Sequence, residues 1–360
     1  MKKLIKKTLI FAVSTMIVIT TVSCRTNNKS LTQSSQTSGM SNIKYRETLR
    51  VFNASEYIDK STIMDFEKEF AIKVEYAEFE SNEDMYEEIL NNPNAYDVLI
   101  PSDYTIHRLI KEDRLAKIDK TKIPNIANVA EEYLKPVYDP NNDFVVPYMV
   151  GTLGILYNKK QVTAPVERWA VLFDPQYNGK VLMLNSQRDS IGLVLKMLGF
   201  SMNSNDDMEL ARAKKMLLTA RSIASGYYES EEIRDKMVAG EGVLGVVYSG
   251  DAKTAVDRNP NLAYVIPKEG SNKWVDGFVI MKNTQHLEAA HKFINFMCRP
   301  NIAVRNMTSI GYTSPISGAW AEFGNNKIMF TTLEELARCE SFLYNEQASQ
   351  KYSKLWSEVR

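Results

Sequence analysis

The chain has 360 residues, of which 44% are hydrophobic and 24% charged, the composition of an ordinary soluble protein. Its formal net charge is zero, and removing the first 23 residues, which include four lysines and no acid, leaves 40 basic against 44 acidic residues. This mildly acidic balance argues against nucleic acid as a partner and favours a cationic ligand. The length suits two domains better than one.

Residues 1–23 have the pattern of a cleaved export signal. Four lysines precede the apolar run 9–19, which is too short to span a bilayer. Ser23 is the small residue that a signal peptidase needs before its cut, and Cys24 follows it. The order resembles a bacterial lipoprotein signal with Cys24 as the lipidated N-terminus, although Thr21 stands where Leu is usual. An ordinary signal with a chance cysteine is the alternative.

Residues 24–44 are expected to form a flexible tether. They are rich in Ser, Thr, Asn and Gln and carry almost no large apolar side chains, so they cannot build a core. About 20 such residues have a root-mean-square span of about 25 Å, and their stretched limit is about 66 Å. The tether would hold a globular body clear of lipid headgroups.

From residue 45 onward, short apolar runs alternate with amphipathic segments, which is typical of an open, largely parallel α/β sheet. Gly240 is expected to end the helix predicted at 230–239. The extended stretch 145–158 separates two such sets of elements and predicts a crossover between two α/β lobes. The patterns predict strands at 49–52, 72–79, 97–100, 181–184 and 243–248, and helices at 61–70, 82–90, 190–198, 208–220 and 230–239, with a further helix that 101–103 opens.

Carboxylates and aromatic rings gather where the predicted strands end, which is where open α/β sheets bind ligands. A buried ammonium needs a paired carboxylate to offset its desolvation, and an aromatic face adds about 0.5 to 2 kcal/mol. These groups have the chemistry of a site for a flexible organic dication or trication, but from the pattern alone rim packing and helix capping are the commoner explanation. The groups lie at 53–57, 102–104, 186–189, 248–251, 274–276 and Tyr312.

Short motifs along residues 49–360 match one family at collinear positions. By these motifs the chain resembles the spermidine/putrescine-binding proteins of polyamine ABC importers, a class of extracytoplasmic solute receptors. The motifs are Phe52-Asn53, Ser55-Glu56-Tyr57, Tyr96 to Ser102, Asp139 to Asp143, Pro147-Tyr148, Asp174 to Lys180, Leu198 to Phe200, Pro267 to Gly270, Arg299-Pro300 and Ile310 to Tyr312.

The resemblance implies an α/β fold of the two-lobed periplasmic-binding-protein type (type II), in which each lobe is a mixed sheet flanked by helices and the ligand cleft lies between the lobes. The N-terminal lobe is expected to comprise 45–154 and 275–320, and the C-terminal lobe 155–274 and 321–360. Crossings between the lobes are expected near residues 151, 274 and 320.

The resemblance also implies a set of ligand-binding residues. Asp276 would clamp an amine between Trp274 and Tyr312, and Glu56 with Ser55 would bind the other end. The remaining members of the expected set are Tyr57, Ser102, Tyr104, Ser186, Asp189 and Tyr248.

Several positions depart from the family pattern. Ala54 and Tyr248 stand where the family has Trp, Ser186 replaces Asp, and Asp189 replaces Glu. The amide-bearing residue expected near Phe342 has no secure equivalent. With one carboxylate fewer, a diamine or weakly bound spermidine is as plausible as tightly bound spermidine, and another cationic or zwitterionic solute stays open.

Some of these residues have simpler interpretations. The alternative for Glu56 is that it caps a helix, and the alternative for Tyr312 is that it packs in a turn. Asp103 is read as a helix N-cap, with a replacement for the charge missing at Ser186 as the alternative. Arg188 is expected to pair with Asp189. Cys298 and Cys339 are expected to be free thiols, with a disulfide as the alternative.

The sequence gives little support for catalysis or for a cofactor. His107, His286 and His291 lack the spacing of a zinc motif, and no phosphate loop or nucleophile elbow is present. The chain is therefore expected to be a non-enzymatic, monomeric receptor outside the cytoplasm, periplasmic or on the cell surface, that serves a permease and its ATPase. A surface lipoprotein that binds a host or envelope protein is the alternative.

Overall fold

The computed structural model describes residues 43–324, 326, 329 and 331–360. The predicted export signal, Cys24 and nearly all of the tether lie outside the described residues. Within residues 43–360, as far as they are described, no helix is both long and apolar enough to span a membrane.

The nine strands of the described chain belong to one hydrogen-bonded network, in the order β2-β1-β3-β9-β4-β7-β5-β6, with β8 paired to β4. β1 is parallel to β2 and β3, and β5 is parallel to β6 and β7. β9 is antiparallel to β3 and β4, and β4 is antiparallel to β7 and β8. The strands are β1 (Glu47–Ala54), β2 (Ile72–Phe79), β3 (Val98–Leu99), β4 (Val146–Asn158), β5 (Val181–Leu184), β6 (Ala224–Tyr228), β7 (Leu244–Tyr248), β8 (Leu262–Val265) and β9 (Lys273–Ile280).

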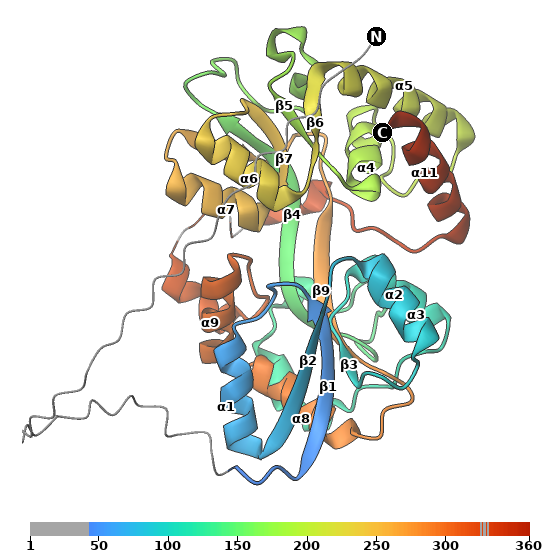
Figure 1. Ribbon diagram of the computed structural model, residues 1–360, viewed down its shortest axis with the longest axis vertical. Coiled ribbons are helices and arrows are strands. Elements are labelled where there is room, and N and C mark those ends of the chain that lie inside the picture. Colours follow the sequence, from blue (N-terminus) through green and yellow to red (C-terminus); the bar gives the residue numbers. More distant parts are fainter. Residues whose placement is uncertain (1–42, 325, 327–328, 330) are drawn as a thin grey trace, which may run out of the picture. The chain divides into compact units, whose positions relative to one another are not determined.

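Two lobes share the long strands β4 and β9, which run side by side from one lobe into the other (Figure 1). The two-lobed α/β fold with a mixed sheet in each lobe is thus confirmed. The helices are α1 (Lys60–Phe70), α2 (Asn82–Asn91), α3 (Asp103–Lys111), α4 (Gln187–Met197), α5 (Asp207–Ile223), α6 (Ser230–Ala239), α7 (Ser249–Arg258), α8 (Leu287–Met297), α9 (Pro300–Ile310), α10 (Leu333–Arg338) and α11 (Glu346–Val359).

In the first lobe both faces of the sheet are buried. Successive strand residues point to opposite faces, so neighbouring residues pack in different clusters. Val98 packs with Phe66 of α1 and Phe293 of α8, whereas the next residue, Leu99, packs on the other face with Ile106 of α3. The rings of Phe66 and Phe293 meet edge to face, with centroids 5.2 Å apart. Helices therefore cover both sides of β1, β3 and β9.

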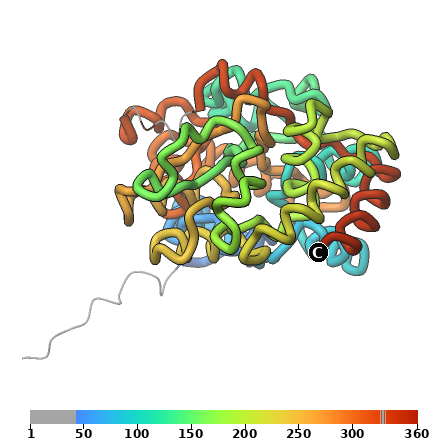
Figure 2. Tube along the Cα trace, turned by 90° about the horizontal axis from the view of Figure 1, so that it is seen from above, coloured from blue at the N-terminus to red at the C-terminus, as the bar shows by residue number. Residues whose placement is uncertain are grey.

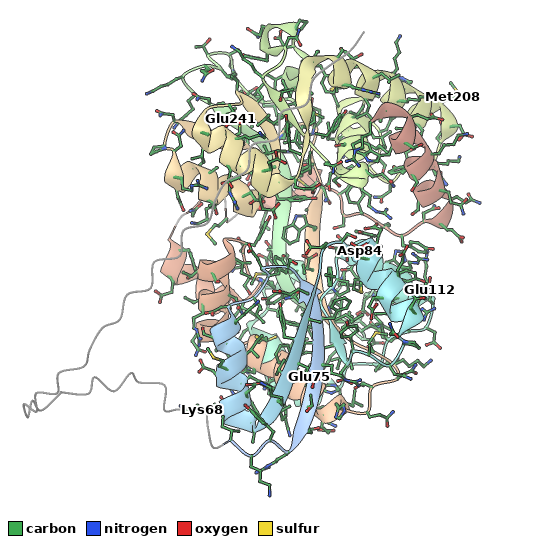
Figure 3. The ribbon with its side chains drawn as sticks, in the orientation of Figure 1. Lys68, Glu75, Asp84, Glu112, Met208 and Glu241 are labelled. Carbon is green, nitrogen blue, oxygen red and sulfur yellow. The ribbon has the colours of Figure 1, made fainter. Side chains whose placement is uncertain are left out.

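The second lobe has its own core around β5 and β7. Trp169, Leu193 of α4, Leu217 of α5 and Ile233 of α6 are fully buried in it. The C-terminal helix α11 returns to this lobe and packs against α4 and α5, as Figure 2 shows near the C-terminus. Charged side chains and Met208 project from the outer faces of the elements; Figure 3 labels Lys68, Glu75, Asp84, Met208 and Glu241, all of them exposed.

The local patterns predicted most elements and several of their ends. Ser81 caps α2, because its hydroxyl accepts from the backbone N–H of Asp84. α6 ends at Gly240. The stretch 145–158 forms the crossover strand β4. Both Cys298 and Cys339 are buried free thiols, so the disulfide alternative is wrong.

The sheet order predicts that a fragment of residues 45–154 does not fold by itself. β9 lies between β3 and β4, so the fragment would lack the central strand of its own sheet together with Phe278 and Phe293. We expect a fragment of this range to show no cooperative thermal transition in circular dichroism, whereas residues 43–360 do. A sharp two-state melt of the fragment would contradict this reading of the topology.

Candidate functional site

β9 carries Trp274 and Asp276 into the region between the two lobes. The Tyr57 hydroxyl donates to Asp276 Oδ2 over 2.9 Å, whereas Oδ1 is buried and has no hydrogen-bond partner among the described residues. Burial raises the pKa of Asp276 to about 6, although the nearby hydroxyls of Ser102 and Tyr57 lower it. At neutral pH the site thus holds a carboxylate that is only partly compensated.

Two further carboxylates in this region have the same kind of partner, a tyrosine hydroxyl. Tyr248 donates to Asp189 Oδ2 over 2.8 Å, and Tyr312 donates to Asp251 Oδ2 over 3.2 Å. Burial raises the pKa of both acids, since little water reaches them. A neutral donor orients a carboxylate without neutralising its charge.

The carboxylates differ in how fully they are satisfied. Asp189 also accepts from Ser186 over 2.8 Å and from Asn272 over 3.0 Å. Asp251 forms an ion pair with Arg234 over 3.1 Å. Among these three acids, Asp276 therefore has the most bonding capacity left for a ligand.

The rings of these tyrosines continue into a row of aromatic side chains. Trp274 meets Tyr312 and Tyr248 edge to face, with centroids 5.2 and 6.5 Å away, and Tyr57 meets Tyr312 at 5.9 Å. Aromatic faces beside carboxylates suit a cation with an apolar stem.

Two glycines let these rings come close to the backbone. A Cβ at Gly151, the cross-strand neighbour of Trp274, would lie 2.3 Å from the indole ring. A Cβ at Gly250 would lie 2.6 Å from the ring of Tyr312. Neither position accepts a side chain without moving the ring.

Two of the hollows between the lobes are each lined by more than one of the predicted ligand-binding residues. One of about 900 Å³ is lined by Ser55, Glu56 and Tyr57 from the first lobe and by Asp251 and Arg234 from the second. The other, of about 800 Å³, is lined by residues of both lobes that include Tyr104, Ser186 and Arg188.

The predicted ligand-binding residues fall into three places. Tyr57, Asp189, Tyr248, Trp274, Asp276 and Tyr312 form the connected cluster, with Ser102 beside Asp276. Ser55 and Glu56 lie at the rim of the larger hollow, where Glu56 is exposed and has φ 55°. Tyr104 and Ser186 line the other hollow.

Three of the simpler interpretations are wrong. Glu56 caps no helix, since Asp59 caps α1. Asp103 is the first residue of α3, after Ser102 at the N-cap position, and its Oδ1 accepts from the Tyr104 backbone N–H. The Arg188 guanidinium stacks over the Tyr104 ring, 4.1 Å from its centroid, and donates to Ser349 instead of pairing with Asp189.

Sequence reasoning missed Asn272 and Tyr138. Asn272 precedes β9 and reaches Asp189, which is 83 positions away in the chain. Tyr138 lies in the loop that precedes β4, and its hydroxyl is buried and has no hydrogen-bond partner among residues 43–360 as far as they are described. Neither position follows a predicted strand, so no local signal marks it.

Side chains suited to a metal do not cluster in the described part of the chain. No group of three or more His, Cys, Asp or Glu side chains there could hold a metal ion. The candidate site is thus built from carboxylates, hydroxyls, one amide and aromatic rings.

Comparisons with known proteins identify the family. Residues 94–327 match the family model of a bacterial extracellular solute-binding protein. The spermidine/putrescine-binding periplasmic protein of Salmonella typhimurium is 33% identical over 300 residues, which cover 82% of this chain and 86% of that protein. The putrescine-binding periplasmic protein SpuD of Pseudomonas aeruginosa is 33% identical over 291 residues, covering 76% and 79%.

A solved structure is similar over nearly its whole length. The spermidine/putrescine ABC transporter substrate-binding protein PotD of Streptococcus pneumoniae, solved with calcium and HEPES, superposes with a TM-score of 0.78 at 33% identity. The superposition covers 87% of this chain and 98% of that one. The chain therefore belongs to the bacterial extracellular solute-binding proteins of ABC transporters, a family whose role is binding and transport.

Proposed function

We propose that this protein binds a polyamine, putrescine or spermidine, between its two lobes outside the cytoplasmic membrane and delivers it to the permease of an ABC importer. The observation that carries the proposal is the partly compensated Asp276 carboxylate inside a row of aromatic rings. A buried anion is costly without a cation beside it. An ammonium on a methylene stem supplies the charge and packs on the rings.

The proposed ligand-binding residues are those expected from the sequence. Tyr57, Trp274, Asp276 and Tyr312 would enclose one ammonium, and Asp189 with Tyr248 would hold another through contacts that Ser186 and Asn272 orient. Ser55 and Glu56 at the rim would contact a long amine only weakly, because water reaches them. Ser102 and Tyr104 complete the set.

The site is made by both lobes, and this supports a mechanism in which the ligand favours closure. Tyr57 and Asp276 meet on the first lobe's side, whereas Asp189, Tyr248 and Asp251 belong to elements of the second. A ligand that touches both sides binds the closed state better and shifts the equilibrium toward it. The permease would then recognise the closed form.

We propose that the lobes divide as the sequence suggests, at 45–154 with 275–320 and at 155–274 with 321–360. The two cores support this division except near the first boundary. Met149 and Phe278 pack in the first core and Leu262 in the second, but Leu153 already packs in the second, so the first crossing would fall before residue 153. Met329 still packs in the first core and Ala348 in the second. The last crossing would therefore follow residue 329.

Asp276 should dominate the affinity. Removing one partner of a buried charge pair costs about 3 to 5 kcal/mol, so Asp276→Asn should raise the Kd about a hundred- to several-thousandfold. Isothermal titration calorimetry with putrescine and with spermidine measures this loss.

Glu56→Ala provides the comparison for that experiment. It removes an acid that is exposed at the rim, so we expect a much smaller loss of affinity. Asp276→Asn that binds either amine as tightly as the parent would show that the cleft serves another solute.

The same substitution should stabilise the ligand-free protein at neutral pH. The folded-state pKa of Asp276, about 6, lies above its ordinary 3.8, so ionisation destabilises the fold as the pH rises between these values. At about 1.4 kcal/mol per pH unit, the cost is about 3 kcal/mol above pH 6.

Urea unfolding of the ligand-free parent and of Asp276→Asn tests this expectation. The variant should be the more stable protein at pH 7.5, and the difference should fade toward pH 4, where the parent's carboxyl is protonated. Equal stability at both pH values would mean that water compensates the carboxylate.

We also propose that Cys24 carries a lipid that anchors the protein to a membrane, with residues 25–44 as the tether. In the native host, Cys24→Ser should move the protein from the membrane fraction to the soluble fraction without changing its melting temperature. Because serine has no thiol to form the thioether that would hold the lipid, continued membrane retention of the variant would point to a different anchor.

A further inference from the structure

Asp103 is a carboxylate that the proposed site does not use. It begins α3, is 2% exposed, and has one oxygen, Oδ1, bonded to the Tyr104 backbone N–H over 2.7 Å. Its other oxygen, Oδ2, is buried and has no hydrogen-bond partner among the described residues. Tyrosine hydroxyls donate hydrogen bonds to Asp276, Asp189 and Asp251, but among the described residues no tyrosine hydroxyl donates to Asp103.

The strand pairing brings Asp103 close to Asp276. β3 pairs with β9, and the Gly277 N–H donates to the Pro101 carbonyl over 3.2 Å, so the start of α3 lies beside Asp276. Burial raises the pKa of Asp103 well above its ordinary value, and the negative charge of Asp276 raises it further. Two carboxylates this close repel each other unless a cation separates them.

Tyr138 adds a third unpaired oxygen at the same place. Its hydroxyl is buried and has no hydrogen-bond partner in the described chain, and burial raises the pKa of Tyr138 strongly, with further increases from the charges of Asp103 and Asp276. The Tyr138 ring stacks on His107 of α3, with centroids 6.0 Å apart. Three buried oxygens without a hydrogen-bond partner among the described residues thus belong to neighbouring side chains: Asp103 Oδ2, Asp276 Oδ1 and the Tyr138 hydroxyl.

The neighbouring side chains do not supply the missing hydrogen bonds to these oxygens. Ser341 lies near Asp103 but donates its hydroxyl to the Lys273 carbonyl. Arg188 of α4 is near enough to lower the pKa of Asp103, yet its guanidinium is stacked on Tyr104 and bonded to Ser349. A primary ammonium offers three N–H donors on one positive charge, which matches three acceptors and two carboxylates.

We infer that Asp103, Asp276 and Tyr138 form a subsite for a terminal primary ammonium of the ligand. This inference rests on the proposed polyamine function and extends it, because it assigns the end of the molecule that Asp276 holds and adds a charge that the cleft lacks at Ser186. Putrescine and spermidine both end in primary ammoniums. Both should therefore depend on Asp103.

Asp103→Asn tests the subsite, because it removes the charge but keeps the oxygen that accepts from Tyr104. A hydrogen bond to a charged group corresponds to roughly a ten- to hundredfold change in Kd, and we expect a loss in this range for both amines by calorimetry. Asp207→Asn is the matched control, since Asp207 is also the first residue of its helix, α5, but pairs with Lys351 on the surface. It should leave the Kd unchanged.

Arg188→Gln separates ligand binding from an attraction between the lobes. If Asp103 holds the ligand, Asp103→Asn weakens binding in the Arg188→Gln background as much as in the parent. If Asp103 acts only on Arg188, its substitution has no further effect there, and the inference is overturned. An unchanged Kd for folded Asp103→Asn, or a loss confined to spermidine, would also overturn it. A parent protein that binds neither amine would instead refute the proposed function itself.

Discussion

The pairing of β4 with β9 is the constraint on which the rest of this structure depends. β9 comes late in the chain but lies between β3 and β4, so the two lobes share one hydrogen-bonded network. The pairing places Trp274 opposite Gly151 and Asp276 beside the start of α3. Both lobes position the side chains on a strand that they share. This suits a site whose ligand is bound when the two lobes move together.

The electrostatics of the site follow from that placement. Asp276, Asp189 and Asp251 lose water because elements of both lobes surround them, and neutral tyrosine hydroxyls orient them without cancelling their charge. Arg234 neutralises Asp251, whereas Asp276 has no such partner in the described chain. The ligand-free protein thus gives up some stability at Asp276, which the proposed cationic ligand would restore. The same imbalance would make the proposed site selective for positive charge.

The aromatic row sets the shape of the ligand. The rings of Tyr57, Tyr312, Trp274 and Tyr248 meet edge to face. Those of Trp274 and Tyr312 also pack closely against glycines, so the positions of the rings are well defined. Rings that are fixed in this way offer flat faces to methylene groups at little entropic cost. A flexible organic cation with methylene groups fits this lining better than a compact ion does.

The sequence by itself determined the α/β class, the crossover strand at 145–158, the starts of α1, α2, α5 and α6 to within one residue, and the family to which the chain belongs, because these depend on short periodic patterns and collinear motifs. Only the tertiary structure decided that Arg188 stacks on Tyr104, that Asp103 Oδ2 has no hydrogen-bond partner among the described residues, and that Asn272 reaches Asp189. Tyr57 and Asp276 are 219 positions apart in the chain. A side chain's charge balance depends on its neighbours in space, and those neighbours are set by how distant strands pair.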